Sequence, residues 1–463
     1  MPKPVLSNVV CSAPGKVLLA GGYLVLDRAY TGLVLGLDAR IHVLAQPSAA
    51  SDSGPSEIVV RSPQFKDAIW RYHFENLEKD GGIRLSQIKA SSTSPPENRF
   101  VQTALTYALT WACSRAGAEI QPMEFTILAD SDYYSNEAKS FDFDDRFQNF
   151  DVPLHEAHKT GLGSSAALVT AIVNAAVLFY SKETTQEQDQ WMFRLAQAAH
   201  CAAQGKIGSG FDVAAASQGS CIYRRFSPEI LSSLGSANQA GFQERLRAVI
   251  EGKRSYGIEL NAAWDYECGE AFSRFPVGLR VVMCDIDCGS ETVGMVSKVL
   301  QWKKEKPEEA SLLWATLQVA NEDLANQLRK CIHTITCFDG VYDDVRSTLL
   351  TIRSLVREMS MKAAVPIEPP VQSALIDACS ELPGVIGGVV PGAGGYDAIA
   401  LLVRNDTGTI HRLGSFLSMY KSEADNGDTV SIARVRVLKS KQVDKGGWQV
   451  ENCDNYRSWL RCA

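Results

Sequence analysis

The stretch Lys159-Thr160-Gly161-Leu162-Gly163-Ser164-Ser165-Ala166-Ala167 turns from glycines and serines directly into a run of small and apolar residues that predicts a helix. Glycine has no Cβ, so this backbone can approach an anion closely, and the free N–H groups at the start of the helix face that anion. The two hydroxyls lie where magnesium bound to a nucleotide needs an oxygen ligand. We interpret the stretch as a phosphate-binding loop, although its spacing alone also fits a tight turn in which Ser164 caps a core helix.

Three further stretches combine glycines with charged or hydroxyl side chains. Pro14-Gly15-Lys16 precedes an apolar run that predicts a strand, where a lone lysine is ordinarily part of a solvated turn. Residues 205–212, GKIGSGFD, follow a predicted helix over 191–204 and present one lysine, one hydroxyl and one carboxylate. Residues 387–397 place five glycines between two strand-like runs. That last pattern fits a simple hairpin as well as a ligand-binding turn.

In this order, the four stretches resemble the GHMP kinase superfamily of galacto-, homoserine, mevalonate and phosphomevalonate kinases. Residues 21–27, 204–212 and 391–397 are most similar to the phosphomevalonate kinase family of eukaryotic type. Gly21-Gly22-Tyr23 stands where mevalonate kinases usually carry Gly-Glu-His, and the long Arg-and-His signature of galactokinases is absent. Lys16 separates the chain from the diphosphomevalonate decarboxylases, which lack this lysine.

The resemblance implies an α/β (α+β) fold of two domains with the site between them. An N-terminal ATP-binding domain, residues 1–260, would contain a left-handed β-α-β unit, which is an exception to the usual handedness. A C-terminal domain, residues 261–463, would have ferredoxin-like layers and close over the first. The length of 463 residues independently favours two domains, whereas periodicity supports only a mixture of helices and strands.

The reaction implied by the resemblance is transfer of the γ-phosphoryl group of ATP to (R)-5-phosphomevalonate. The products would be (R)-5-diphosphomevalonate and ADP, in the mevalonate route to isoprenoids and sterols, with ATP and Mg²⁺ as cofactors. Such a transfer depends on positioning and charge neutralisation. By the same resemblance, Lys16 and Asp212 are catalytic, the residues from Lys159 to Ala167 bind ATP, and Ser165 also ligates the metal.

An acceptor that is itself a phosphate needs more positive charge or more hydrogen-bond donors than an alcohol does. Arg99 and Lys159 are candidates for binding the acceptor phosphate, but an ordinary position on the surface explains them equally well. Ser290 and Thr292 are also candidates, and the competing explanation for them is a helix cap at Val293. The residues expected to bind the acceptor are Lys206, Ser209, Ser290, Thr292, Gly392, Ala393 and Gly394.

One departure from the superfamily affects the metal. Mevalonate kinases carry a magnesium-binding glutamate about eleven residues before the catalytic aspartate, and Cys201 stands there, beside His200. We therefore expect the metal to rest on Ser165, the ATP phosphates and water, with Asp212 as a further candidate. The second pKa of a phosphate monoester is about 6, so the acceptor needs no proton removed near neutral pH. Asp212 is accordingly interpreted as a residue that orients Lys16 and the phosphates.

Composition supports an enzyme with a small-molecule substrate. The net charge is −7 and no block of basic residues stands out, so we expect no nucleic-acid partner. The longest apolar stretch, residues 166–180, contains Thr170 and Asn174, and it predicts a buried helix rather than a membrane span. The N-terminus lacks the apolar region of a signal peptide. The twelve cysteines are scattered, which favours reduced thiols and a cytoplasmic location. We also expect no obligate protein partner, since none is evident in the sequence.

Two other functions remain open at this point. One is a sister small-molecule kinase, of which mevalonate kinase is the nearest. The other is a non-catalytic ligand sensor on the same fold. Lys16, Ser165 and Asp212 are all present, which argues against the sensor.

Overall fold

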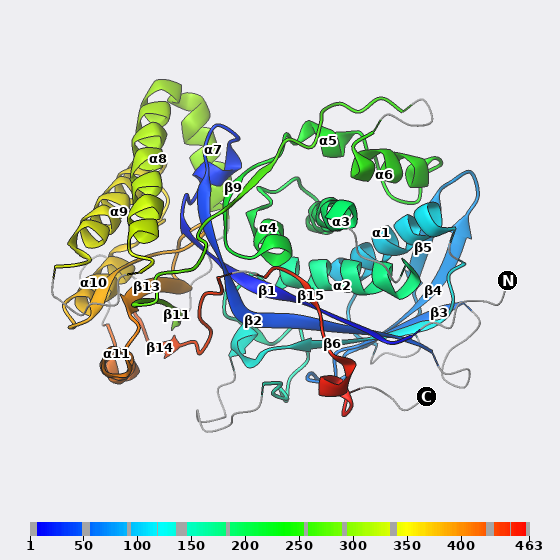
Figure 1. Ribbon diagram of the computed structural model, residues 1–463, viewed down its shortest axis with the longest axis horizontal. Helices are drawn as coiled ribbons and strands as arrows, with labels where there is room; N and C mark the ends of the chain where they lie inside the picture. The colour runs from blue at the N-terminus through cyan, green and yellow to red at the C-terminus, as the bar shows by residue number, and fades with distance from the viewer. Residues whose placement is uncertain are drawn as a thin grey trace.

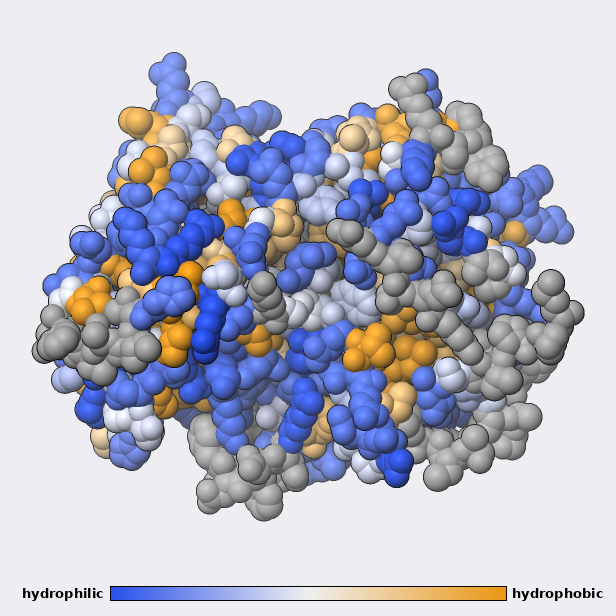
Figure 2. Space-filling model, in the orientation of Figure 1, coloured by the Kyte–Doolittle hydropathy of each residue, from blue (hydrophilic) through white to orange (hydrophobic). Residues whose placement is uncertain are grey.

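Two β-sheets organise the molecule (Figure 1). The computed structural model describes residues 7–48, 56–89, 94–117, 119–135, 146–181, 186–253, 258–288, 294–333, 340–422, 430–444 and 446–459. A nine-stranded sheet carries the helices α1 to α4 on one face, and a four-stranded sheet lies beside it, packed with the longer helices α8 and α9. Hydrophilic side chains cover most of the face shown in Figure 2, and apolar residues form separate patches on it.

The large sheet has the order β10-β9-β2-β6-β3-β4-β5, and β1 pairs with both β2 and β15. β3 and β6 are parallel and are connected through β4, β5 and α1. The strands of this sheet are β1 (Val9–Ala20), β2 (Gly32–Pro47), β3 (Glu57–Arg61), β4 (Ile69–Leu77), β5 (Gly82–Gln87), β6 (Met123–Ala129), β9 (Cys221–Arg224), β10 (Glu267–Glu270) and β15 (Gln449–Val450).

A register shift in β1 explains how a proline and a lysine share one strand. The pairing with β2 is antiparallel, and it shifts between Pro14 and Lys16, opposite Arg40 and Gly36. Proline is tolerated at such an irregularity because it has no N–H to give to the ladder. Bulges also redirect the side chains that follow them. Pro14-Gly15-Lys16 is therefore an irregular point inside a long, mostly buried strand, and the alternative of an ordinary solvated turn does not apply there.

Helices bury the inner face of the large sheet. α2 is long and apolar enough to cross a membrane by length and composition, but most of it lies in the core between β1, β2, α1 and α3. α1 begins where the Asn98 side chain accepts a hydrogen bond from the N–H of Val101, and it ends before Gly117 in the left-handed conformation. The helices of this half are α1 (Arg99–Ala116), α2 (Ser164–Ser181), α3 (Gln186–Gln204), α4 (Phe211–Gln218), α5 (Glu229–Ser232) and α6 (Phe242–Glu251).

The smaller sheet is antiparallel and has the order β12-β13-β11-β14. Along the chain, helices α7 to α10 lie between β11 and β12, and helix α11 lies between β13 and β14. This alternation is the ferredoxin-like pattern expected above. Its elements are β11 (Leu279–Asp287), α7 (Met295–Glu305), α8 (Pro307–Lys330), α9 (Asp343–Ala363), α10 (Pro370–Ser380), β12 (Val385–Val389), β13 (Ala398–Arg404), α11 (Thr407–Met419) and β14 (Arg434–Val437). The remaining short elements are η1 (Leu24–Leu26), η2 (Ser131–Tyr133), β7 (Tyr134–Ser135), β8 (His158–Lys159) and η3 (Cys453–Tyr456).

After β14 the chain returns to the large sheet as a C-terminal strap, residues 438–444 and 446–459, drawn in red in Figure 1. Lys441 and Asp38 exchange two hydrogen bonds of 2.9 Å, and β15 then pairs with β1. Both β10 and β15 thus join the nine-stranded sheet although they follow residue 260. The division of the chain at 260/261 stays a prediction.

Buried polar groups hold the strap against the sheet. Arg40 donates hydrogen bonds to the Gly447 carbonyl at 2.7 Å and to the Ser12 hydroxyl at 2.7 Å. Ser12 in turn donates to the Glu451 carboxylate at 2.5 Å. The strap also crosses α4 without a side chain between them, since a Cβ placed on Gly447 would lie 2.0 Å from the Ser217 carbonyl oxygen. The helix that carries Asp212 is therefore packed directly against the C-terminal strap.

The close contact between Gly447 and the Ser217 carbonyl predicts how substitutions of glycine change the stability of the protein. We expect Gly447→Ala to lower the free energy of unfolding by about 1–3 kcal/mol, because the new Cβ meets backbone that cannot move aside. The matched control is Gly414→Ala in α11, where a Cβ would have no neighbour within 4 Å. There, alanine should raise stability by about 0.5–1 kcal/mol. Denaturant unfolding measures the change in the free energy of unfolding for each variant. Equal free energies of unfolding for Gly447→Ala and Gly414→Ala would contradict the close contact between the strap and α4.

Candidate active site

The phosphate-binding loop lies against the irregular point in β1. The N–H of Lys16 donates to the Leu162 carbonyl at 2.9 Å, and the Lys16 ammonium donates to the Gly161 carbonyl at 3.3 Å. Gly163 has a φ of +82°, and a Cβ there would lie 2.9 Å from Cε of Lys16. Glycine is required at this position both by the backbone conformation and by the lysine that passes over it. The first two motifs, 145 residues apart, therefore form one structure.

The side chains of the predicted ATP-binding run point in different directions. Gly161 has a φ of +74° with open space around it, and α2 begins at Ser164, so the loop backbone and the helix N-terminus are placed as expected. Thr160 is buried and donates to the Asp132 carbonyl at 2.5 Å. The side chains packed in the interior are those of Leu162, Ala166 and Ala167. These four residues can offer backbone groups to a ligand in the loop, but their side chains point elsewhere.

His200 brings two of the predicted residues together. Its Nε2 lies 3.1 Å from the Ser165 hydroxyl and 3.8 Å from the Asp212 carboxylate. Gln204 approaches the same nitrogen at 3.4 Å. The His200 side chain is 2% exposed, whereas that of Asp212 is 21% exposed. Sequence reasoning noticed His200 only as the neighbour of Cys201, and nothing in the local pattern indicates that it joins α2, α3 and α4.

Cys201, at the position of the family glutamate, faces the interior. Gln197 donates to its sulfur at 3.4 Å, and burial raises the pKa of its thiol. A neutral buried thiol is a poor ligand for magnesium, which prefers oxygen. This geometry agrees with the expectation that the metal does not rest on residue 201.

Tyr223 of β9 and Arg225, which directly follows β9, shape the loop before Asp212. Tyr223 donates to the Ser209 carbonyl at 2.8 Å, and Arg225 donates to the Gly208 carbonyl at 2.9 Å. Gly210 precedes α4 with a φ of +86°. Asp212 then falls in the first helical turn, where its carboxylate accepts a hydrogen bond of 2.9 Å from the N–H of Val213. The carboxylate is thus held at a helix N-terminus, which favours a negative charge.

The Lys16 side chain is half-buried beside α4. The Lys16 ammonium nitrogen lies 5.6 Å from the centre of the ring of Phe211, the residue that precedes Asp212. Burial lowers the pKa of Lys16 below the ordinary lysine value, and the charge of Asp212 partly opposes that shift. Lys16 and Asp212 are therefore electrostatically coupled, as the interpretation of Asp212 as an orienting group requires.

The C-terminal glycine turn reaches this region from the other half of the molecule. Tyr23, which follows β1, donates to the Ala393 carbonyl at 2.7 Å. A Cβ on Gly22 would lie 2.8 Å from the Gly392 carbonyl oxygen, so the two backbones are in close contact. The turn formed by residues 391–395 joins the antiparallel strands β12 and β13, as the hairpin interpretation expects, and it also contacts the loop after β1.

The other predicted acceptor residues differ in placement. Lys206 is exposed and Ser209 is half-buried, both on the loop before α4. Ser290 and Thr292 lie outside the described residues.

A pocket of 460 Å³ beside the phosphate loop was missed by sequence reasoning. Apolar side chains supply much of its wall, with the exposed Lys159 at one side. It adjoins a cavity of 80 Å³ whose lining includes Ser164 and Ser165. Both spaces are lined by Trp70, Asn98, Phe100, Leu154 and Lys159. Arg99 also lines the larger pocket, which places it and Lys159 at this concave surface.

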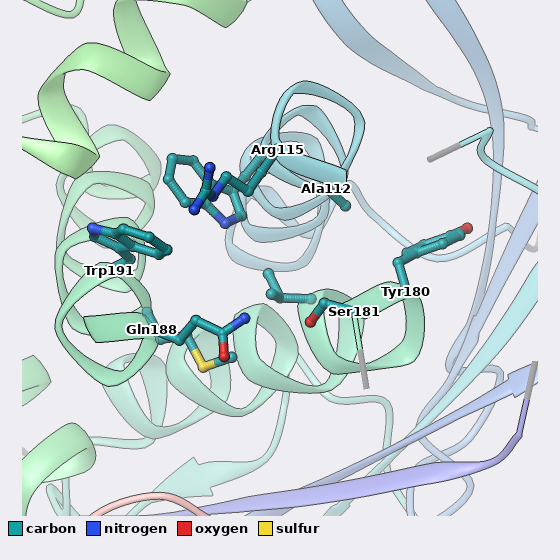
Figure 3. Close-up of a pocket in the computed structure, with 9 residues that line it drawn as sticks. Ala112, Arg115, Tyr180, Ser181, Gln188 and Trp191 are labelled. Atoms are coloured by element: carbon teal, nitrogen blue, oxygen red, sulfur yellow. The ribbon is translucent and has the colours of Figure 1, made fainter. Parts of the chain in front are cut away.

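A third cavity lies between the ends of α1 and α2 and the start of α3 (Figure 3). Its volume is 20 Å³, which is enough for a single water molecule. Arg115 lies over the Trp191 ring with its guanidinium carbon 4.7 Å from the ring centre. We regard this cavity as a packing gap between helices and exclude it as a substrate site.

Comparison with known proteins identifies the family. Residues 142–220 match the family described as GHMP kinases N terminal domain. The phosphomevalonate kinase of Aspergillus fumigatus is 45% identical over 490 residues, covering 97% of this chain and 98% of that protein. The phosphomevalonate kinase of Gibberella zeae is 42% identical, covering 98% of this chain and 99% of that protein. The chain therefore belongs to the phosphomevalonate kinase family.

Solved structures share the fold at much lower identity. The Streptococcus pneumoniae phosphomevalonate kinase in complex with phosphomevalonate and AMPPNP has a TM-score of 0.60 at 15% identity, covering 93% of this chain and 100% of that chain. Mevalonate kinase from L. major in complex with R-mevalonate has a TM-score of 0.52 at 13% identity. The expected GHMP kinase fold is confirmed.

The coupling of Lys16 to Asp212 predicts the alkaline pH dependence of turnover. If Lys16 offsets phosphate charge it must be protonated, so kcat/KM should fall as pH rises through the lowered pKa of Lys16. Because the Asp212 carboxylate raises that pKa, Asp212→Asn should move the alkaline limb to lower pH. Lys16→Arg keeps the charge and should remove the limb from the accessible range. A limb at the same pH in wild type and Asp212→Asn would contradict the coupling.

The two serines of the loop should differ in effect. If Ser165 supplies an oxygen to the metal, Ser165→Ala should lower kcat/KM for magnesium-ATP by about 10-fold to 100-fold. Ser164→Ala is the matched control, one residue earlier in the same helical turn, and should change kcat/KM by a much smaller factor. Circular dichroism and thermal melting confirm folding of both variants. Equal small losses would support a capping role alone.

Proposed function

We propose that the chain is an ATP-dependent phosphotransferase that converts (R)-5-phosphomevalonate and ATP into (R)-5-diphosphomevalonate and ADP. The observation that carries the proposal is 45% identity to a phosphomevalonate kinase over nearly the whole of both chains. The assembly of Lys16, Ser165 and Asp212 around one region supports it, because a phosphoryl transfer needs cations and oxygen ligands at one place.

The nucleoside of ATP is assigned to the 460 Å³ pocket. The half-buried Phe100 offers flat apolar surface for a purine, the mostly buried Trp70 lies in the same wall, and Asn98 offers a polar group there. The adjoining cavity leads to Ser164 and Ser165, where the helix N-terminus favours phosphate. This arrangement supports a binding mode in which the nucleoside lies in the pocket and the phosphates reach the loop at Gly161–Gly163.

Magnesium is assigned to the oxygen groups around His200. Among the residues that the structure describes, no set of three or more His, Cys, Asp and Glu side chains is arranged as a metal site. Mg²⁺ in kinases is held largely by substrate phosphates and by one or two protein oxygens, so Ser165 and Asp212 suffice. The ion would neutralise charge on the phosphates of ATP.

The residues of the chain divide the remaining work. Lys16 lies between the phosphate loop and Asp212, and its charge would offset the repulsion between donor and acceptor phosphates. Asp212 orients Lys16, and His200 fixes the positions of the Ser165 hydroxyl and the Asp212 carboxylate. No proton has to leave a dianionic acceptor, so neither carboxylate nor imidazole is needed as a base.

The acceptor is assigned to the space between the two sheets. Lys206 and Ser209 border it from the loop before α4, and the turn containing Gly392, Ala393 and Gly394 borders it from the other side. The contact of Tyr23 with Ala393 supports this placement, because it joins the turn to the strand that carries Lys16.

We also assign the protein to the cytosol. The ten cysteines among the described residues are free, as a reducing compartment requires. The phosphomevalonate kinase of Arabidopsis thaliana, 32% identical over 87% of this chain, is named as peroxisomal. Fractionation of the native cell therefore decides between the two compartments.

Acceptor specificity tests the proposed function. In a coupled assay of ADP release, we expect turnover with 5-phosphomevalonate and weak turnover with mevalonate, because the site neutralises an acceptor phosphate. Galactose should give no turnover. Lys16→Met is the inactive control that excludes a contaminating kinase. Faster turnover with mevalonate would show a mevalonate kinase, and binding of 5-phosphomevalonate without ADP release would show a ligand sensor.

A further inference from the structure

A buried ion pair lies behind the C-terminal glycine turn. Arg353 of α9 donates to the Glu368 carboxylate from Nε at 3.0 Å and from Nη2 at 2.7 Å. The two side chains are 2% and 1% exposed. Glu368 belongs to the short connection between α9 and α10, residues 364–369. The pair therefore fixes this connection against α9.

One oxygen of Glu368 is the centre of the contacts. Besides both nitrogens of Arg353, it accepts hydrogen bonds from Arg357 at 2.9 Å and from the Ser373 hydroxyl at 2.8 Å. Arg353 also binds Asp377 at 2.5 Å, so two cations face two carboxylates. The group is neutral in sum and exerts little net field on a distant ligand. Burying such a pair costs desolvation that its attraction often fails to recover, so stability alone does not explain it.

The connection that Glu368 fixes holds the glycine turn directly. The carbonyl of Ile367, the residue before Glu368, accepts a hydrogen bond of 2.9 Å from the N–H of Gly395. Gly394 has a φ of +79°, and a Cβ there would lie 2.2 Å from the same carbonyl oxygen. Gln372 of α10, fully buried, donates to the Tyr396 carbonyl at 2.6 Å. The turn has no freedom to shift unless this connection shifts with it.

We infer that the Arg353–Glu368 ion pair is a positioning device for the acceptor-binding turn at residues 391–395, acting through Ile367 and Gly395. The inference rests on the proposed function, which assigns the turn to 5-phosphomevalonate. Neither side chain touches the substrate. Their effect is geometric, because backbone N–H groups of a glycine turn bind an anion only when they are held in one orientation.

The test replaces both charges at once. Arg353→Met/Glu368→Leu removes the pair without leaving a buried charge unpaired, a change that proteins often tolerate. We expect KM for 5-phosphomevalonate to rise tenfold or more, while KM for ATP stays within twofold, because the phosphate loop belongs to the other sheet. Hydrogen exchange at the Gly395 amide should accelerate at least tenfold.

Arg346→Met is the matched control. Arg346 lies two turns before Arg353 on α9 and binds the carbonyls of Ser380 and Val385, at the far end of α10 from the turn. It should leave KM for 5-phosphomevalonate and exchange at Gly395 within twofold of wild type. Ser373→Ala, which removes one hydrogen bond from Glu368, is a milder second variant should the double variant not fold. Its KM for 5-phosphomevalonate should rise in the same direction by a smaller factor.

Separate outcomes decide the inference and the proposed function. Unchanged exchange at Gly395 in a folded variant overturns the inference, and so does an equal rise in KM for both substrates. If the wild type does not turn over 5-phosphomevalonate, the proposed function fails. The exchange rates alone then decide whether the ion pair holds the turn.

Discussion

The hydrogen bond from the N–H of Lys16 to the Leu162 carbonyl is the constraint on which the site depends. It joins the irregular point of β1 to the phosphate loop, and it determines where the lysine passes over Gly163. That passage requires a residue without Cβ and places the ammonium beside Asp212 and the Phe211 ring. Partial burial of the lysine strengthens its charge interactions relative to those of a fully hydrated side chain. A shift of the strand register would move the lysine out of the site.

The site consists of two halves, and buried groups next to each half hold its residues in place. His200 lies beneath Ser165 and Asp212 and is covered by the core, so the two oxygen groups keep their spacing. The C-terminal strap packs against α4 at Ser217, which limits movement of the helix that carries Asp212. On the other side, the ion pair at Glu368 supports the glycine turn. Preorganised groups of this kind lower the cost of positioning two phosphates in line.

The contact between Tyr23 and Ala393 is a direct link between these halves. It joins the loop after β1 to the turn after β12, and so connects the two walls of the proposed acceptor space. Burial raises the pKa of Tyr23, and the hydroxyl therefore remains a donor across the physiological range. This link makes the acceptor space dependent on the arrangement of the two sheets.

The sequence by itself determined the local chemistry of the site. The glycine backbone of the phosphate loop and the helix starting at Ser164 follow from neighbouring residues and from glycine's missing Cβ. Only the tertiary structure decided the rest. The pocket draws on Trp70, Phe100 and Lys159, and His200 acquires its role from α2 and α4, because contacts between distant segments leave no periodic signal. Thr160 was predicted from the sequence to bind ATP, but its hydroxyl donates a hydrogen bond to the Asp132 carbonyl inside the fold.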